Sequence, residues 1–291
     1  MSTRVRRVAA VHDMSCFGRC SLTVILPTLS TLGVQVCPLP TAVLSTHLGG
    51  FTSLEFCDFT DHMPAFFHHW QQEGITFDCI YSGFLASQQQ IDVVNTFITD
   101  FSQNAPLILV DPVMGDEGKL YSTYTPQMQQ QMAVLVQKAD IITPNFTEAC
   151  FLLGESYQNP FPNIKKIEDW LHRLAAMGPS IVVITGIPLA TGKIANAGYD
   201  LNNQTFLLDT CAYIPAHYPG TGDIYASVLL GSLLHGDNLT KAMKRSSSFV
   251  SLAIKTTFAA HTPTREGVLL EKVLPWLSQE FWQLRKELVR S

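Results

Sequence analysis

Short apolar runs alternate with longer helix-like segments along most of this 291-residue chain. Runs such as 107–110 and 181–184 are continuously apolar, as expected of strands that are buried on both faces of a parallel sheet. The pattern predicts strands at 5–11, 34–39, 78–82, 106–111, 140–143 and 181–185, and two antiparallel strands at 194–199 and 205–208. It predicts helices at 22–32, 63–72, 88–101, 126–137, 145–153, 167–177, 221–234 and 239–259.

This order of elements predicts the α/β class, with a parallel sheet covered by helices on both faces. In such sheets a ligand binds beyond the carboxyl ends of the strands. Asp111, Asn145, Thr185 and Gly186 each lie at the end of a predicted strand or just after one, so we expect them to converge at one edge of the sheet. The chain shows no linker and no internal repeat, which predicts a single domain spanning residues 1–291.

The most informative stretch is Gly220-Thr221-Gly222-Asp223, which is followed at once by an apolar segment that predicts a buried helix. Glycines allow N–H groups to approach a ligand closely. A helix N-terminus attracts phosphate through its unpaired N–H donors and its dipole. An acid fixed beside such a site can accept a proton from an attacking hydroxyl. The stretch therefore predicts phosphoryl transfer, with a simple helix cap as the alternative.

Other candidate residues also have a structural alternative. Asp111 ends a buried strand and offers the oxygen ligands that hard cations such as Mg²⁺ prefer, although an Asp also stabilises turns. Asn145 and Glu148 are three residues apart on one helix face, but this spacing is also that of a capping box. His47 lies in a polar, glycine-bearing loop typical of substrate loops, and a surface histidine fits that loop equally well.

The composition argues against several classes of partner. The formal net charge of −5 argues against nucleic acid, and no apolar run reaches the length of a membrane span. Seven scattered cysteines without Cys-x-x-Cys spacing indicate free thiols in a reducing compartment, so we expect a cytoplasmic protein. Residues 186–193 come closest to a Walker A loop but contain one residue too many, and we reject that motif.

The order of the motifs resembles the ribokinase-like superfamily of small-molecule kinases. Asp-Pro-Val-Met-Gly at 111–115, Thr-Pro-Asn at 143–145 and Asn-x-x-Glu at 145–148 precede Gly-Thr-Gly-Asp at 220–223. This set is typical of the vitamin-kinase branch, which holds pyridoxal kinases and hydroxymethylpyrimidine kinases. Within that branch, Ser-Thr-His at 45–47 and Tyr-Ser-Gly-Phe-Leu at 81–85 look most like pyridoxal kinase. The resemblance covers roughly residues 5–260.

The resemblance implies a three-layer α/β/α sandwich with a mainly parallel central sheet, ATP as the phosphoryl donor, Mg²⁺, often a monovalent cation such as K⁺, and a homodimer. It implies phosphorylation of the 5′-hydroxymethyl group of pyridoxal, with pyridoxine and pyridoxamine as further candidate acceptors. Asp223 would be the base that deprotonates this hydroxyl. The N–H groups of Gly220, Thr221 and Gly222 would stabilise the charge on the transferred phosphoryl group.

The same resemblance divides the remaining site residues between nucleotide and acceptor. Asn145 and Glu148 would organise Mg²⁺ and the phosphates, Asp111 would lie near the metal, and Thr185 and Gly186 would approach the ATP phosphates. Asp111 and Glu148 are therefore the expected metal ligands. The acceptor side is expected to comprise His12, Ser15, Thr46, His47, Phe84 and Asp223.

Two departures leave the acceptor open. Phe84 stands where pyridoxal kinases commonly carry Tyr, so a hydroxyl is lost. The loop at 12–18 follows neither the Ser-x-Val-x-x-Gly form of pyridoxal kinases nor the Gly-Gly-Ala-Gly form of hydroxymethylpyrimidine kinases. Hydroxymethylpyrimidine kinase is thus the alternative enzyme, and a nucleotide-sensing module without turnover is the alternative from another class. Such a module does not need an acid directly after its anion loop.

Overall fold

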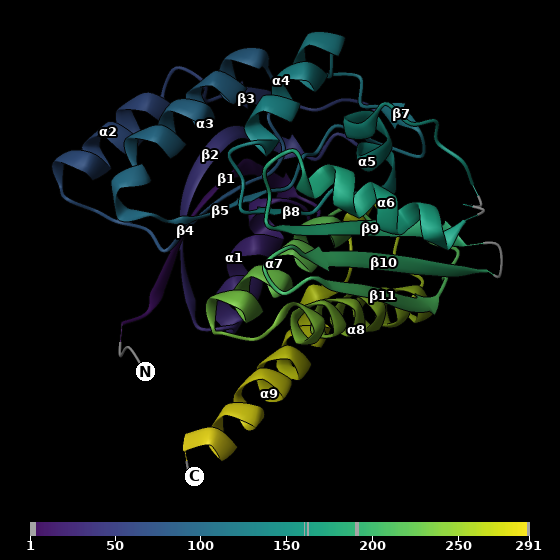
Figure 1. Ribbon diagram of the computed structural model, residues 1–291. Helices are drawn as coiled ribbons and strands as arrows, with labels where there is room; N and C mark the ends of the chain where they lie inside the picture. The colour runs from purple at the N-terminus through teal and green to yellow at the C-terminus, as the bar shows by residue number, and fades with distance from the viewer. Residues whose placement is uncertain (1–3, 160, 162, 190–191, 290–291) are drawn as a thin grey trace.

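The computed structural model describes residues 4–159, 161, 163–189 and 192–289. Nine of its strands form one sheet in the order β11-β10-β9-β8-β5-β4-β1-β2-β3 (Figure 1). These strands are β1 (Arg6–Phe17), β2 (Val34–Thr46), β3 (Phe56–Asp58), β4 (Cys79–Ser82), β5 (Leu107–Val110), β8 (Ile141–Ile142), β9 (Ile181–Leu189), β10 (Lys193–Asp200) and β11 (Thr205–Ala212). The strands from β9 through β8, β5, β4 and β1 to β2 pair in parallel. At the edges, β10, β11 and β3 pair antiparallel, which confirms the predicted α/β class.

Helices cover both faces of this sheet, as the apolar strands require. The helices are α1 (Leu22–Thr31), α2 (Met63–Gln72), α3 (Gln88–Asp100), α4 (Pro126–Val136), α5 (Phe146–Leu153), α6 (Ile164–Ala175), α7 (Thr221–Leu234), α8 (Leu239–Ala259) and α9 (Leu270–Val289). Helices α2 to α6 pack on one face, and α1, α7, α8 and α9 pack on the other (Figure 1). Along β1, Ala9 and Val11 join the first core while Val8 and Ala10 join the second. Alternate side chains of a strand point to opposite faces, so one apolar strand supplies both cores.

Side-chain caps fix the starts of several helices. Ser87, Thr125 and Asn145 each accept a hydrogen bond from an N–H group in the first turn of α3, α4 and α5. Pro126 occupies the first position of α4, where the missing N–H costs no helical hydrogen bond. The predicted bounds 63–72, 221–234 and 239–259 agree with α2, α7 and α8, and of these three helices only α8 begins with a side-chain cap, which Asn238 provides.

The first two strands are longer than their apolar runs predicted. After a register shift between His12 and Met14, β1 and β2 continue to pair as far as Phe17 and Thr46. Backbone pairing, rather than burial of both faces, extends the strands here, so the apolar pattern gave no signal for it. The short hairpin of β6 (Gly115–Asp116) and β7 (Lys119–Leu120), strand β3 and helix α9 were also not predicted.

The structure also bears on the predictions about membrane spans and cysteines. No helix in the described part of the chain combines the length and apolarity needed to cross a membrane. The seven cysteines are all free thiols, as their spacing predicted. The single-domain organisation over 1–291 stays a prediction.

Candidate active site

Helix α7 begins at a glycine turn that leaves its first N–H groups uncapped. Gly220, the N-cap residue, has a left-handed backbone with φ of 79° and no side chain with which to cap. The Thr221 hydroxyl donates to the carbonyl oxygen of Tyr218 at 3.0 Å instead of capping the helix. A Cβ placed at Gly222 would meet no described atom within 4 Å. The N-terminus of α7 therefore offers N–H donors beside open space, which is the geometry of an anion site.

Gly220 is required by packing as well as by its backbone angle. A Cβ on this residue would lie 2.3 Å from the carbonyl oxygen of Arg19 and 3.0 Å from Cα of Cys20. Both neighbours are backbone atoms and cannot rotate away. The glycine thus lets the loop between β1 and α1 lie directly against the start of α7.

Asp223 lies in the first turn of α7 and is 9% exposed. Its Oδ2 accepts a hydrogen bond from the Ser21 N–H at 2.9 Å, and the Cys20 thiol lies 3.7 Å from the same oxygen. Burial raises the pKa of Asp223 to about 7, and the charge of Asp13 also acts to raise it. A carboxylate with a pKa near neutrality is well matched to accept a proton at physiological pH.

Asp111 and Glu148 add two further buried carboxyl groups close to Asp223. Burial raises the pKa of Asp111 well above its usual range, and the charge of Asp223 raises it further. Burial likewise raises the pKa of Glu148, with the charge of Asp111 as the next cause. These mutual effects show that three carboxyls predicted from separate strand ends and helix starts do converge at one edge of the sheet.

The structural alternative for Asn145 and Glu148 is realised. Asn145 Oδ1 accepts the Glu148 N–H at 2.9 Å, and Glu148 Oε2 accepts the Asn145 N–H at 2.7 Å, which together form a capping box. Glu148 Oε1 also accepts the Met114 N–H at 3.0 Å. Asn145 forms an isolated parallel β-bridge with Thr185 of β9. The predicted nucleotide residues are therefore together, and Glu148 also fixes the loop that follows Asp111.

Gly186 has a conformation that suits close approach by a ligand. Its φ is 70°, and a Cβ there would meet no described atom within 4 Å. Its N–H donates to Asn196 Oδ1 at 3.1 Å, and Asn196 in turn donates to Ser247 Oγ at 3.0 Å. The N–H of Gly186 is thus already engaged, which limits what it can offer to a phosphate.

His47 makes structural contacts with both ring nitrogens, and its predicted contact with substrate stays a prediction. Its Nδ1 accepts the Gly49 N–H at 3.1 Å, so its Nε2 carries the proton and donates to the carbonyl oxygen of Arg265 at 2.6 Å. The ring also fills the space beside Gly18, where a Cβ would come within 2.6 Å of it. Both ring nitrogens are occupied by backbone groups. His47 therefore holds three loops together and has no polar atom left for a substrate.

His12 and Ser15 are fully buried rather than facing a ligand. Burial lowers the pKa of His12 to about 3, so its ring is neutral. That ring packs edge-on to Tyr81 and occupies the space above Gly83. The Ser15 hydroxyl donates to Asp13 at 3.2 Å. Neither residue presents an exposed polar atom, so the expectation of direct substrate contact finds no support at these two positions.

Phe84 and Thr46 are the remaining residues predicted on the acceptor side. Phe84 is 7% exposed and belongs to the core beneath α2 and α3. The Thr46 hydroxyl is buried, and no described residue provides a hydrogen-bond partner for it. Their contact with a substrate stays a prediction.

The β6–β7 hairpin brings Asp116 and Tyr121 to the site, and neither residue was predicted there from the sequence. Pairing of Gly115 with Leu120 turns the chain back, and the Tyr121 N–H then donates to the Met114 carbonyl at 2.9 Å. Partial burial raises the pKa of Tyr121, and the nearby charges of Glu148 and Asp116 raise it further. Asp116 Oδ2 lies 3.4 Å from Nε2 of His217, in the loop before α7. No periodic pattern marks this polar segment, so neither contact could be predicted from the sequence.

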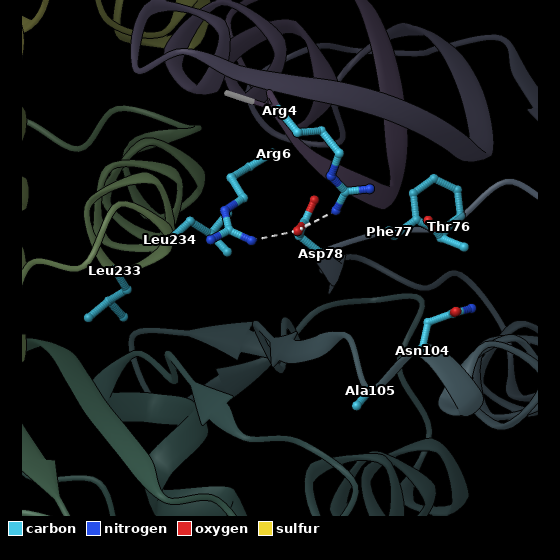
Figure 2. Close-up of a pocket in the computed structure, with 9 residues that line it drawn as sticks. All are labelled: Arg4, Arg6, Thr76, Phe77, Asp78, Asn104, Ala105, Leu233 and Leu234. Carbon is cyan, nitrogen blue, oxygen red and sulfur yellow. Dashed lines mark hydrogen bonds and ion pairs between the residues drawn. The ribbon is translucent and has the colours of Figure 1, made fainter. Parts of the chain in front are cut away.

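A separate pocket of about 520 Å³ lies near the amino ends of β1 and β4, away from the candidate site (Figure 2). Asp78 accepts hydrogen bonds there from Arg4 at 2.7 Å and Arg6 at 2.8 Å. Leu233 and Leu234, at the far end of α7, line the same pocket. Leu233 is ten residues beyond Asp223 in α7, so at about 1.5 Å per residue the pocket is roughly 15 Å from Asp223 along the helix and is distinct from the candidate site.

Comparison with known proteins places this site in a family. Residues 26–266 match the phosphomethylpyrimidine kinase family. The chain belongs to this family. It is 30% identical to a pyridoxal kinase of Arabidopsis thaliana over 264 residues, which cover 82% of this chain and 80% of the relative.

Solved structures of the family resemble the whole fold. A Bacteroides thetaiotaomicron protein assigned as a phosphomethylpyrimidine kinase, crystallised with pyridoxal, is 44% identical with a TM-score of 0.90, and the match covers 94% of this chain and 96% of that protein. Pyridoxal kinase from Lactobacillus plantarum is 31% identical with a TM-score of 0.85, covering 98% and 99% of the two chains. The ribokinase-like fold expected from the ordered motifs is thereby confirmed.

The two glycines at the start of α7 give a matched test of this geometry. Gly220→Ala should lower the free energy of unfolding by roughly 1–3 kcal/mol through backbone strain, and more if the methyl group displaces the Arg19 loop. Gly222→Ala should leave stability unchanged or slightly raised, because its methyl group enters open space. Urea unfolding followed by circular dichroism measures both. Equal losses in the two variants would contradict the packing described for Gly220.

Proposed function

We propose that this chain transfers the γ-phosphoryl group of ATP to the 5′-hydroxymethyl group of pyridoxal. The observation that carries the proposal is Asp223, a buried carboxyl group whose pKa is raised to about 7 beside the uncapped N-terminus of α7. A proton acceptor next to an anion site is what phosphoryl transfer to an alcohol requires. The choice of acceptor is supported by the 44% identical relative that was crystallised with pyridoxal.

In the proposed reaction, Asp223 accepts the proton of the 5′-hydroxyl as its oxygen attacks the γ-phosphorus of ATP. The bond from that phosphorus to the β–γ bridging oxygen breaks, and ADP leaves. The Ser21 N–H holds Oδ2 of Asp223, which directs Oδ1 to the substrate. N–H groups of Thr221 and Gly222 stabilise the negative charge that spreads over the transferred group.

Asp111 and Glu148 fit a role beside Mg²⁺. Their burial near a third carboxyl creates a concentration of negative charge that a divalent cation would relieve. Within the described residues, His, Cys, Asp and Glu side chains form no group of three or more suited to hold a metal. Phosphate oxygens and water would therefore complete the coordination, as is usual for Mg²⁺ in such enzymes. When bound, the ion neutralises phosphate charge.

Hydroxymethylpyrimidine kinase is the second candidate, because the family that matches residues 26–266 carries the phosphomethylpyrimidine kinase name. Pyridoxal is favoured by the curated pyridoxal kinase relatives and by the loops at 45–47 and 81–85. Dependence on K⁺ and the homodimer stay predictions from the resemblance, and the cytoplasmic location stays a prediction from the cysteine pattern.

Direct assay of the purified protein tests the proposed activity. With ATP and Mg²⁺, pyridoxal should yield pyridoxal 5′-phosphate and one equivalent of ADP, and kcat/KM should be higher for pyridoxal than for hydroxymethylpyrimidine in competition. Product from the pyrimidine alone would establish the second candidate. Binding of ATP with no product from either heterocycle, or from pyridoxine or pyridoxamine, would instead indicate a nucleotide-sensing module.

Replacing the proposed base should separate chemistry from binding. Asp223→Asn should lower kcat by about 10²–10⁴-fold, the usual contribution of general-base catalysis. The dissociation constant for ATP, measured by calorimetry, should change little, because Asp223 acts on the acceptor hydroxyl and not on the nucleotide in this scheme. Asp92→Asn, an exposed residue on α3, is the control and should behave as the wild type. An unchanged kcat in Asp223→Asn would exclude Asp223 as the base.

The raised pKa of Asp223 predicts a pH dependence. Because the carboxyl must be ionised to accept a proton, kcat/KM for pyridoxal should fall as pH drops through about 7, the pKa to which burial raises this group. Rates measured from pH 5 to 9 at saturating ATP test this expectation. The residual activity of Asp223→Asn should lack this acid limb. A midpoint below pH 5 in the wild type would show that Asp223 titrates as an ordinary carboxyl.

A further inference from the structure

A fourth buried acid, Asp13, lies near Asp223 and has no part in the reaction described above. Asp13 is 5% exposed. Its Oδ1 accepts the Ser21 hydroxyl at 2.6 Å, and its Oδ2 accepts the Ser15 hydroxyl at 3.2 Å. Hydrogen bonds from neutral donors to a carboxylate are shorter and stronger than those between neutral groups. Asp13 therefore ties β1 to Ser21, the residue that precedes α1.

Ser21 adopts a backbone conformation that only a strong constraint can maintain. Its φ of 52° and ψ of −133° lie where residues with a side chain are rarely found. Such a conformation costs roughly 1–3 kcal/mol and persists where the surroundings over-determine it. Ser21 is also the N-cap residue of α1, yet its hydroxyl is directed to Asp13. Its hydroxyl therefore does not accept a hydrogen bond from an N–H group of the first turn of α1, which is the usual role of a serine at this position.

This conformation aims the Ser21 N–H at the proposed base. The N–H reaches Oδ2 of Asp223 at 2.9 Å, while the hydroxyl of the same residue is held by Asp13. Among the described residues, no hydrogen bond engages Oδ1 of Asp223. One carboxylate oxygen is thus fixed and the other is left for the acceptor hydroxyl. The contact of Gly220 with Arg19 and Cys20 keeps this loop against α7.

We propose that Asp13 and Ser21 are positioning residues that orient the Asp223 carboxylate for proton transfer. Asp13 anchors the Ser21 side chain, the anchored Ser21 holds its strained backbone, and its N–H then fixes Asp223. Neither residue touches the substrate in this scheme. The inference rests on the proposed function, in which Asp223 is the base.

The test compares Asp13→Ala with Asp13→Asn. Loss of the anchor in Asp13→Ala should lower kcat by about 10- to 100-fold, since misplacing a catalytic group by 1 Å costs about that much. The KM values for ATP and pyridoxal should stay within about 3-fold of wild type, because the residue acts through orientation of the base. Asp13→Asn keeps an acceptor for Ser21 and should recover most of kcat. Ser246→Ala, which removes a buried hydroxyl bonded within α8, is the matched control and should retain wild-type kinetics.

A double-mutant cycle shows whether Asp13 acts through Asp223. In the Asp223→Asn background, Asp13→Ala should cause no further loss of kcat, because the group that it orients is gone. An unchanged kcat in Asp13→Ala, or a full additional loss in the double variant, would overturn the proposal. If Asp13→Ala does not fold, Ser21→Ala serves the same test and should cause the same loss of kcat, because it removes the hydroxyl that Asp13 holds and leaves the strained backbone without its anchor.

Failure of this inference is distinguishable from failure of the proposed function. If the wild type phosphorylates pyridoxal and Asp223→Asn is inactive while Asp13→Ala is normal, only the positioning role is excluded. If the wild type phosphorylates no vitamer, the proposed function itself is excluded.

Discussion

The close approach of Gly220 to the Arg19 carbonyl oxygen is the contact on which the geometry of the site depends. A single added methyl group would fall 2.3 Å from that oxygen. A second glycine of α7, Gly231, lies against Leu32 just after α1, where a Cβ would come within 2.4 Å of the leucine side chain. These glycines let two helices from distant parts of the chain pack closely. The packing places the uncapped N–H groups of α7 beside the loop that carries Ser21.

Around this junction, the protein buries carboxyl groups that no lysine or arginine of the described residues pairs with. The donors that engage Asp13, Glu148 and Asp223 are hydroxyl, thiol and backbone N–H groups. Buried carboxylates compensated only by neutral donors are costly to ionise, and their pKa values rise accordingly. In a kinase site this cost is useful, because it raises the pKa of the base toward neutrality and favours the binding of a cation. The buried carboxylates thus lower the stability of the fold and raise the pKa of the proposed base.

Residue type alone leaves the roles of Glu148 and His47 open, and the structure shows what their side chains contact. Glu148 is at the site, yet its carboxylate completes a capping box and supports the Met114 N–H. His47 was expected to contact substrate, but its two nitrogens bind the backbone at Gly49 and Arg265. A histidine in a polar loop is compatible with either role. Arg265 is more than 200 residues further along the chain, so the fold alone reveals which role applies.

By itself the sequence determined the α/β class and the bounds of α2, α7 and α8, and it predicted that Asp111, Asn145, Thr185 and Gly186 lie at one edge of the sheet, because apolar periodicity is local and strand ends share one edge of a parallel sheet. The tertiary structure decided the extension of β1 and β2, the hairpin that brings Tyr121 to the site, and the hydrogen bonds that orient Asp223. Each of these depends on a partner distant in sequence. Ser21 shows the difference most clearly, because only the packing of the first loop against α7 brings its N–H to Asp223.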